Sequence, residues 1–514
     1  MVSSTYDYIV IGAGAGGAVM ANRLSENPDV RVLLLEAGTG DIPEAVRIPA
    51  AWPTLWGTSI NWGYQTVPQE ALGGRVINEP RGKVVGGSSD FYIMMHIRGH
   101  RSDYDNWAYN GAPGWAYDDI MKYFQKLENQ EDETSPWAGH GGPISVINAK
   151  NHHPNPTSEV FLEACYERGY PRTEDFNGPN MIGAGWHHVN IKDGKRHGAN
   201  EAYIEPILGK RPNFILSPNS YATRLLFEGT RCTGVEYRQG NEKVEAYADR
   251  EVIVCAGAIE SPHLLMLSGI GEAEHLEEFG IDVLVDLPGV GENFHNHVLT
   301  GLIYETKREV PPPRLNIAGE AAMFVKSSHG WLAPDLQIAF VHAPFDIIIG
   351  QQNPNAVSML PGLVRPLSRG YIALQSADPF VKPLIDPNYL SMESDVERLV
   401  KTIEIGRDIF SANAFKDWLT GKELLPGPQY RTPEQLEEFV MQRADSYHHQ
   451  AGSCKMGLDD MAVVDPECRV WGIDGLRVAD ASVMPAVPSG NCHAGILMIA
   501  ERVADLVKQE NGTY

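Results

Sequence analysis

The sequence predicts an α/β protein with a discontinuous nucleotide-binding domain and a second, α+β domain built around an antiparallel sheet. Two observations support this fold class. A strand, a glycine-rich turn, a helix and a second strand follow one another within residues 6–36, and a continuous apolar strand at 251–256 is typical of the same buried parallel sheet. A third observation is the change of sequence pattern after residue 306, where segments that resemble strands alternate with predicted helices.

The N-terminal unit is a complete βαβ motif. Residues 6–11 are predicted as a strand, 18–24 as an amphipathic helix and 30–35 as a second strand that stops at Glu36. The turn between the first strand and the helix is Gly-Ala-Gly-Ala-Gly-Gly, residues 12–17. A glycine turn alone is weak evidence for a ligand. Here the strand, the helix and the acid agree with it, and together they predict a Rossmann-like dinucleotide site.

The glycines and the acid of this motif have separate physical roles. Gly12 permits the tight turn, Gly14 lets the backbone approach a pyrophosphate, and Gly17 allows the helix to lie near the strand. The helix N-terminus adds unpaired N–H groups for the anion. Glu36 is placed to bind a ribose, and its charge disfavours a 2′-phosphate there, which leaves both NAD and FAD open.

The next part of the chain is predicted to be loop-rich, with two helices. Residues 41–81 show little periodicity. The segment 81–89, Arg-Gly-Lys-Val-Val-Gly-Gly-Ser-Ser, ends in four small residues, which suits backbone that passes close to a flat or charged ligand; a simple tight turn is the alternative. Helices are predicted at 118–127 and at 156–169.

From residue 213 the pattern favours strands. Apolar pieces at 214–216, 222–227, 233–237 and 246–256 are separated by glycine and asparagine turns, which is typical of an antiparallel meander. The end of the last piece is continuous and apolar, so we expect it to lie buried on both faces in the parallel sheet that begins at Tyr6. The nucleotide-binding domain is therefore assembled from segments far apart in the sequence.

The C-terminal part is predicted as a substrate domain followed by a return to the first sheet. Strands are expected at 336–341 and 370–374, helices at 395–410 and 433–443, and then a short strand at 476–480 and an amphipathic helix at 494–507. The predicted division of the chain is 1–155, 198–305 and 446–514 for the nucleotide-binding domain, and 156–197 and 306–445 for the substrate domain.

Charge and cysteine content limit the possible partners. The 514 residues include 66 acidic and 42 basic side chains, a formal charge of −24, which disfavours binding to nucleic acid or to anionic membranes. The six cysteines show no C-x-x-C pair or histidine cluster, so neither a metal site nor a disulfide framework is indicated. There is no room for a signal peptide before the first strand and no apolar run of 18 residues; the prediction is a cytoplasmic protein without a membrane span.

Five motifs together resemble the glucose–methanol–choline (GMC) oxidoreductases in order and spacing. They are the glycine turn at 12–17, RGKVVGGSS at 81–89, GAIESPHLLMLSGIG at 257–271, LPGVGEN at 287–293 and VADASVMP at 478–485. The resemblance covers nearly the whole chain and is nearest to bacterial choline-dehydrogenase-like and aryl-alcohol-oxidase-like members. It implies FAD rather than NAD, a small alcohol as substrate, hydride transfer to flavin N5, and dioxygen or a quinone-like molecule as final acceptor.

The resemblance also implies roles for individual residues. The family's catalytic histidine precedes a Gly-Thr/Ser pair by three residues, which selects His449 as the base, and its partner, His or Asn in relatives, falls on His493. The implied cofactor-binding residues are Gly12, Gly14, Ala15, Gly17, Glu36, Ala37, Val85, Gly87, Ser88, Tyr92, Ala222, Asp480, Ala481 and His493.

One stretch departs from the family pattern. After Gly-Gly-Ser-Ser the chain has Asp90-Phe91-Tyr92, and His96 stands where an aromatic residue or alanine is usual, so we expect Phe91 and Tyr92 to shape the substrate site near the flavin. In choline oxidase a histidine at the place of Phe91 is bonded to FAD. Phenylalanine cannot form that bond, and non-covalent FAD is therefore predicted.

The chemistry alone also favours histidine. Removing a proton from an alcohol as hydride leaves needs a base with a pKa near neutrality and within hydrogen-bond reach. His448, adjacent to His449, is expected to point elsewhere on an extended chain. His493 is expected at the start of the terminal helix, where the positive end of the helix dipole favours the neutral imidazole.

The motifs disfavour one other class of function and leave several alternatives open. A Ser-His-Asp hydrolase is disfavoured because no G-x-S-x-G elbow is present. On the same scaffold the alternatives are an FAD-containing lyase that resembles the hydroxynitrile lyases, or a photodecarboxylase. A pure binding module is a further alternative, although two histidines beside a flavin site have little structural purpose.

Overall fold

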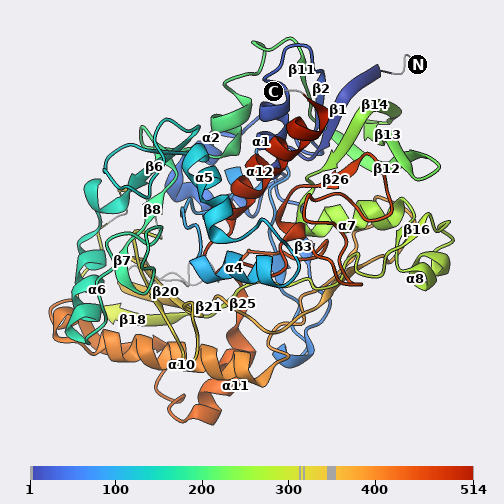
Figure 1. Ribbon diagram of the computed structural model, residues 1–514. Coiled ribbons are helices and arrows are strands. Elements are labelled where there is room, and N and C mark those ends of the chain that lie inside the picture. The colour runs from blue at the N-terminus through green and yellow to red at the C-terminus, as the bar shows by residue number, and fades with distance from the viewer. Residues whose placement is uncertain (1–3, 312–313, 316–318, 344–354, 513–514) are drawn as a thin grey trace.

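The computed structural model describes residues 4–311, 314–315, 319–343 and 355–512. Two sheets lie at opposite ends of the molecule, one at the top and one toward the bottom of Figure 1. The first sheet has seven strands in the order β11-β2-β1-β14-β13-β12, and β26 also pairs with β14. Its strands are β1 Ser4–Ile11, β2 Val32–Leu35, β11 Phe214–Ser217, β12 Ser220–Glu228, β13 Arg231–Gln239, β14 Glu242–Val254 and β26 Leu476–Val478.

The centre of this sheet is parallel and comes from three distant parts of the chain. β1 pairs in parallel with β2 and with β14, and β14 pairs in parallel with β26. Ile9 lies opposite Leu33 on one side and Val252 on the other, and all three side chains are buried. The discontinuous Rossmann-like sheet predicted from the sequence is therefore confirmed.

One prediction about this sheet was wrong. β12, β13 and β14 form the expected antiparallel meander, but β11, which was grouped with them, pairs in parallel with β2 at the far edge. Its three apolar residues extend the parallel sheet, with Phe214 opposite Val32. Apolar content alone does not distinguish the two pairings, because both bury a strand.

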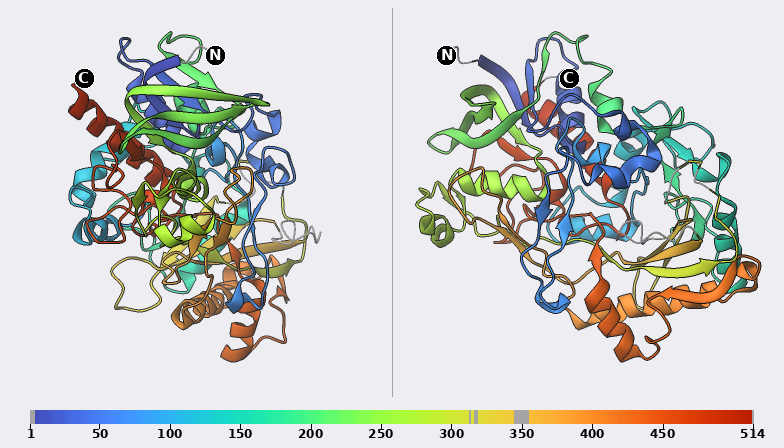
Figure 2. Two further views of the ribbon diagram at one scale, coloured as in Figure 1. Left: turned by 90° about the vertical axis from the view of Figure 1, so that its right-hand side faces the viewer. Right: turned by 180° about the vertical axis from the view of Figure 1, so that it is seen from behind.

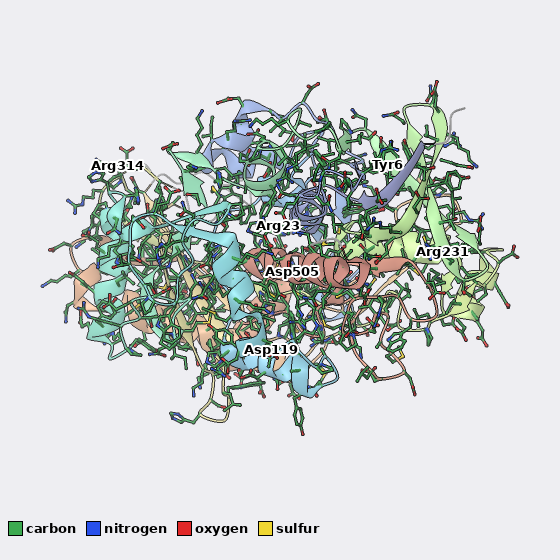
Figure 3. The ribbon with its side chains drawn as sticks, turned by 45° about the horizontal axis from the view of Figure 1, so that its top comes forward. Tyr6, Arg23, Asp119, Arg231, Arg314 and Asp505 are labelled. Atoms are coloured by element: carbon green, nitrogen blue, oxygen red, sulfur yellow. The ribbon has the colours of Figure 1, made fainter. Side chains whose placement is uncertain are left out.

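Two helices from opposite ends of the chain pack together beside this sheet. They are α1 Ala15–Leu24 and α12 His493–Asn511, and Arg23 of α1 forms an ion pair of 2.7 Å with Glu501 of α12. Figure 3 shows Arg23 close to α12, with Asp505 further along that helix. Helix α7 spans Gly257–Leu267. Pro262 lies inside this helix.

The second sheet is antiparallel and belongs to the predicted substrate domain. Its eight strands run in the order β24-β18-β21-β20-β19-β7, with β17 paired to β21 and β25. The strands are β7 Gly183–Trp186, β17 Val298–Leu299, β18 Leu302–Thr306, β19 Ala321–Val325, β20 Leu336–Val341, β21 Ala356–Leu363, β24 Leu419–Leu425 and β25 Asp445–Ser446. The sheet therefore includes residues that precede the predicted boundary at 306.

Helices cover the outer side of this second sheet. α6 Pro156–Glu167 and α10 Glu393–Phe410 pack on its strands, and α11 Pro433–Arg443 packs on α10. Figure 2 shows α10 and α11 below the sheet, on the side away from the first sheet. The helices thus leave the side that faces the first sheet to the segments that carry the glycine and histidine motifs of the sequence.

The remaining elements are short or lie between the sheets. They are α2 Glu44–Arg47, α3 Trp52–Leu55, α4 Arg101–Tyr109, α5 Tyr117–Leu127, α8 Ala273–Glu278, β3 Tyr64–Gln65, β4 Asn78–Glu79, β5 Glu128–Gln130, β6 Ile144–Asn148, β8 His188–Val189, β9 Ile191–Lys192, β10 Lys195–Arg196, β15 Ile270–Gly271, β16 Val285–Asp286, β22 Tyr371–Ala373 and β23 Leu384–Asp386. Within the described ranges no helix is both long and apolar enough to cross a bilayer. All six cysteines are buried and unpaired.

Candidate active site

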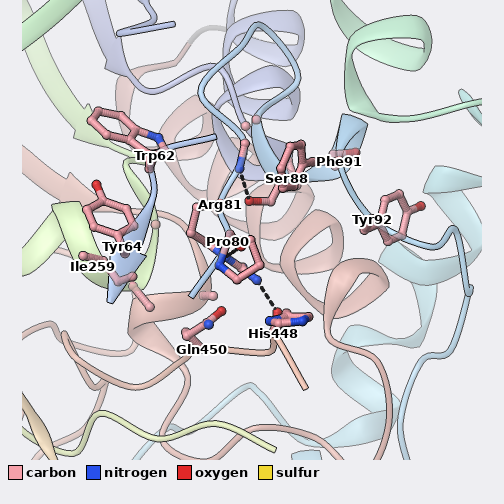
Figure 4. A pocket seen from close by; sticks show the side chains of 18 of the residues that line it. Trp62, Tyr64, Pro80, Arg81, Ser88, Phe91, Tyr92, Ile259, His448 and Gln450 are labelled. Atoms are coloured by element: carbon pink, nitrogen blue, oxygen red, sulfur yellow. Dashed lines mark hydrogen bonds between the residues drawn. The ribbon is translucent and has the colours of Figure 1, made fainter. Parts of the chain in front are cut away.

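A cavity of about 810 Å³ extends from the glycine turn after β1 to the segment that follows β25. It is lined by residues of both sheets and by the loops between them (Figure 4). Most of the residues singled out from the sequence face it: Gly12, Gly14, Ala15, Glu36, Ala37, Gly87, Ser88, Phe91, Tyr92, Ala222, His449, Asp480, Ala481 and His493. Segments separated by hundreds of residues thus meet at one cavity.

Two of the implied cofactor-binding residues, Gly17 and Val85, are not part of this lining. A Cβ atom at Gly17 would collide with the carbonyl oxygen of Gly12, so this glycine lets α1 pack against the turn, which is the physical role predicted for it. Val85 is a buried core residue whose N–H donates to the carbonyl of Thr39 at 3.0 Å. Gly17 and Val85 thus contact residues near the cavity without lining it.

The glycine segments form a cradle of backbone at one end of the cavity. Gly14 precedes α1, no side chain caps the helix, and no acid lies in its first turn. A Cβ atom at Gly87 would come within 2.8 Å of Cα of Gly14. Gly87 therefore has no room for a side chain where the two glycine segments cross. Gly257, with φ +86°, faces open space. An uncapped helix N-terminus beside bare backbone suits the diphosphate of a dinucleotide.

Glu36 lies at the end of β2 with its carboxylate bound to the backbone. Oε2 accepts from the N–H of Ala13 at 2.9 Å and Oε1 from the N–H of Gly38 at 2.7 Å. Burial raises the pKa of Glu36 to about 7, against the opposing effect of these N–H groups and of Lys83. Each carboxylate oxygen has a second lone pair, so the side chain can order the glycine turn and still accept from ribose hydroxyls.

Above the raised pKa of about 7, where Glu36 is ionised, its replacement with alanine is expected to weaken FAD binding by roughly 10- to 150-fold, because a charged hydrogen-bond acceptor contributes about 1.5–3 kcal/mol. Glu36→Gln keeps one acceptor oxygen and is expected to fall between the wild type and Glu36→Ala. Flavin absorbance per protein and the Kd for reconstitution of the apoprotein measure both effects. Equal Kd values for the wild type and Glu36→Ala would exclude the ribose role of Glu36.

His449 lies in the cavity wall just after β25, held by three side chains. Its backbone N–H donates to Oδ1 of Asn296 at 2.7 Å. Its ring Nδ1 is 2.9 Å from Nδ1 of His297, and its Nε2 is 3.2 Å from Nδ2 of Asn491. Burial lowers the pKa of His449 well below 6.5, and the neighbouring His297 and His448 act in the same direction. The ring is therefore neutral at pH 7 and can accept a proton.

The hydrogen bonds of His449 define its tautomer. Nδ2 of Asn491 is a donor, so Nε2 of His449 accepts and the ring proton is on Nδ1. That proton is then donated to Nδ1 of His297. The lone pair on Nε2 of His449 therefore points toward Asn491, from which it accepts this bond, and both residues line the cavity. This is the arrangement that a general base requires.

His493 is the first residue of α12, as predicted, but its surroundings differ from the prediction. Nε2 lies 2.8 Å from Oγ of Ser89, and Nδ1 lies 3.1 Å from the hydroxyl of Tyr92. Burial is the largest cause that lowers the pKa of His493, to about 3, followed by the nearby His96 and Arg196. Both ring nitrogens therefore contact other residues of the protein. The ring is kept neutral mainly by burial, whereas the sequence argument assigned this effect to the helix dipole.

The side chain that meets His449 is Asn491, which sequence reasoning missed. The family pattern requires His or Asn at the partner position, and the segment Ser489–His493 contains one of each. Only the course of the chain into α12 decides which of them reaches His449. His493 contacts Ser89 and Tyr92, and the printed contact of His449 in this wall is with Asn491, so the pairing of His449 with His493 across one substrate oxygen stays a prediction.

The unusual residues Tyr92 and His96 belong to one chain of buried hydrogen bonds. The Tyr92 hydroxyl donates to Oδ1 of Asn190 at 2.7 Å, and Nδ2 of Asn190 donates to Nδ1 of His96 at 3.2 Å. Nε2 of His96 then bonds to Glu128 at 2.9 Å, which is also paired with Arg98. His96 itself does not line the cavity.

Comparison with known proteins shows similarity over nearly the whole chain. Residues 6–299 and 366–500 match the two family models of the GMC oxidoreductases. Human mitochondrial choline dehydrogenase is 41% identical, with 98% of this chain and 90% of the relative covered. The oxygen-dependent choline dehydrogenase of Brucella suis is 38% identical, with 97% and 95% covered. The solved structure of pyridoxine 4-oxidase from Mesorbium loti is 34% identical, covers 99% of this chain and all of its own, and superposes with a TM-score of 0.93.

Proposed function

This chain belongs to the GMC oxidoreductase family, and from that premise we propose that it oxidises a primary alcohol to an aldehyde with FAD as hydride acceptor. The observation that carries the proposal is the neutral His449, whose Nε2 lies beside Asn491 in the wall of a cavity that also contains the glycine cradle. When bound, FAD supplies the flavin ring that takes the hydride. The residues of this chain supply the base and the oxygen-binding groups.

Nε2 of His449 takes the hydroxyl proton of the alcohol. The lowered pKa keeps this atom unprotonated at pH 7, and a base must lie within about 3 Å of the proton that it removes. Asn491 donates from Nδ2 to the same oxygen, where negative charge develops as the hydride leaves. A base and a neutral donor on one oxygen stabilise the alkoxide without a net charge on the protein before the reaction.

The cofactor is proposed to lie along the cavity from the glycine cradle to His449. Gly12, Gly14 and Ala15 would hold the diphosphate, Glu36 the ribose, and Gly87 with Ser88 the flavin side, all of them in the lining. Phe91 is the residue at the position of the tethering histidine of some relatives, and it carries no nucleophile. FAD is therefore proposed to bind without a covalent bond.

Denaturation should release the flavin completely. Acid precipitation of the purified protein followed by filtration is expected to leave the yellow colour in the filtrate, because Phe91 cannot tether the ring. A pellet that stays yellow would reveal a covalent attachment at another residue. Protease digestion and mass measurement of the flavin peptide would then identify that residue.

Phe91 and Tyr92 are proposed to shape the space beside the flavin. Phe91 is only 4% exposed and packs in one apolar cluster with Val46, Leu55, Ile60 and Val84, while its ring also reaches the cavity. It therefore supports the fold as well as the site. Replacing Phe91 should for this reason lower the stability of the protein more than replacing a residue that contacts only the substrate.

Replacing Phe91 with isoleucine is expected to shift the preference between alcohols of different size by about 1–3 kcal/mol, or roughly 5- to 150-fold in the ratio of kcat/KM values. A moderate fall in melting temperature should accompany the shift because the ring is buried. The control is Ile60→Val, in the same cluster but outside the cavity lining. It should lower stability without a change of preference; an equal change of preference in both variants would contradict the role of Phe91.

The test of the proposed activity is reduction of the bound flavin by alcohols without oxygen. A panel of primary alcohols that includes choline and pyridoxine, the compounds in the names of two relatives, should contain at least one that bleaches the flavin absorbance. A lyase or a photodecarboxylase on this scaffold would leave the flavin oxidised in the dark. Reoxidation by dioxygen, with hydrogen peroxide as product, or by a quinone-like acceptor then distinguishes an oxidase from a dehydrogenase.

A further inference from the structure

Glu79, the last residue of β4, is a buried carboxylate that accepts hydrogen bonds from three directions. It is 0% exposed. Oε1 accepts from the hydroxyl of Tyr389 at 2.6 Å, and Oε2 accepts from Oγ of Ser446 at 2.7 Å and from Nε2 of Gln450. Burial raises the pKa of Glu79 to about 7, while its donors and the nearby Arg81 oppose this shift. The side chain does not line the cavity.

Two of these donors are the ends of the segment that carries His449. Ser446 and Gln450 bracket this five-residue segment, here called the histidine segment, residues 446–450. Asn296 donates from Nδ2 to the hydroxyl of Tyr389 at 2.6 Å and to Oγ of Ser446 at 2.8 Å. Its Oδ1 accepts from the N–H of His449. Asn296 thus belongs to the same network as Glu79.

The middle of the histidine segment is held by a residue close to Glu79 in the sequence as well. Arg81, two residues after Glu79, donates from Nη2 to the carbonyl oxygen of His448, and Figure 4 shows this contact. His448 has φ +65°, in the left-handed region that residues other than glycine seldom adopt. Such a conformation persists only where surrounding contacts fix it. Glu79, Arg81 and Asn296 supply those contacts.

We infer that Glu79 is a positioning residue, which holds the histidine segment so that Nε2 of His449 faces Asn491 in the cavity. This inference rests on the proposed function, in which His449 is the base. A carboxylate suits the place because it accepts hydrogen bonds and donates none, and its three protein neighbours are all donors. A glutamine at this position would place its NH2 group against at least one of these donors. Two donors cannot bond to each other, so a hydrogen bond that holds the histidine segment would be lost.

The decisive variant is Glu79→Gln, with Glu320→Gln as the matched control. Glu320 is equally buried and accepts from the N–H of Asn155 at 2.9 Å and from Oγ of Ser158 at 2.8 Å, but it contacts no residue of the histidine segment. Hydrogen exchange of the purified FAD-loaded protein is measured on the peptide that spans 446–450. Glu79→Gln should speed exchange of the His448 and His449 amides roughly 10-fold or more, whereas Glu320→Gln should leave that peptide at the wild-type rate.

The kinetic test is a double-mutant cycle with His449→Ala. Misplacement of a reacting group by about 1 Å can cost on the order of 100-fold, so Glu79→Gln should slow anaerobic flavin reduction roughly 10- to 100-fold when His449 is present. In the His449→Ala background it should change the rate less than about 2-fold, because there is no base left to position. A carboxylate that only stabilises the fold would lower both backgrounds by the same factor, and that result would overturn the inference.

A milder variant keeps the test decisive if Glu79→Gln does not fold. Tyr389→Phe removes one donor to Glu79 and leaves the histidine segment itself intact. It should shift exchange and rate in the same direction by a smaller factor, and wild-type exchange of the 446–450 peptide in this variant would count against the inference. If no alcohol reduces the wild-type flavin, the proposed function fails, and the exchange measurement alone then decides whether Glu79 orders the segment.

Discussion

Replacing His449 with alanine is expected to slow anaerobic flavin reduction by about 10²–10⁴-fold, the usual loss when a general base is removed. Nε2 of His449 is the unprotonated atom beside Asn491 in the cavity wall. Bound FAD should be retained, because the glycine cradle and Glu36 lie at the other end of the cavity. Stopped-flow absorbance at a saturating alcohol concentration measures the rate directly.

The pH dependence identifies the base more specifically than the size of the loss. Burial lowers the pKa of His449 well below 6.5, and a protonated Nε2 has no lone pair with which to take the proton of the alcohol. The wild-type rate should therefore be level near pH 7 and fall on acidification through that lowered pKa. In His449→Ala the titrating group is gone, so the acid limb should flatten.

His448→Ala is the matched control for this prediction. His448 is adjacent in sequence, also lines the cavity and also has a lowered pKa, about 3, through burial. Its Nδ1 is 3.1 Å from Oγ of Ser446, and its ring packs edge-on against Trp56. A loss as large as that of His449→Ala, with FAD still bound and the acid limb removed, would make His448 the base instead.

Replacing Asn491 with alanine is expected to slow flavin reduction by about 10²–10³-fold, the range for loss of one donor to a developing oxyanion. Nδ2 of Asn491 is 3.2 Å from Nε2 of His449, so an alcohol oxygen that approaches one of these atoms also approaches the other. The acid limb should remain because the base is untouched. Asn491→Ala and His449→Ala together should cost less than the product of the two single losses.

The comparison with His493 separates the two candidate partners. His493→Asn removes the contacts to Ser89 and Tyr92 but leaves Asn491 and His449 in place. It should slow flavin reduction less than Asn491→Ala does. If His493→Asn is the more damaging change, or if it abolishes the acid limb while FAD stays bound, the partner of the base is His493, as the sequence pattern first indicated.

Local patterns in the sequence were enough to predict most of the fold. The helix predicted at 433–443 has the same bounds as α11, because Thr432 and Gln435 form a capping box and Pro433 is the first residue of the helix. The βαβ unit was recognisable for a similar reason: the strand period, the glycine turn and Glu36 all lie within about thirty residues. The match to the GMC family confirmed the fold class that these signals predicted.

The tertiary structure alone decided the contacts between distant segments. β11 has the composition of a meander strand, yet it pairs in parallel with β2. The sequence pattern placed the partner of His449 on His493, whereas the path of the chain into α12 brings Asn491 to His449.

Glu79 gave no signal in the sequence, since its role depends on Ser446 and Gln450, which lie more than 300 residues away. Turns, caps and periodicity are encoded by neighbours along the chain. The partner of a buried polar group, in contrast, is fixed only when the sheets and loops have packed, because packing decides which donor and acceptor come within hydrogen-bond distance.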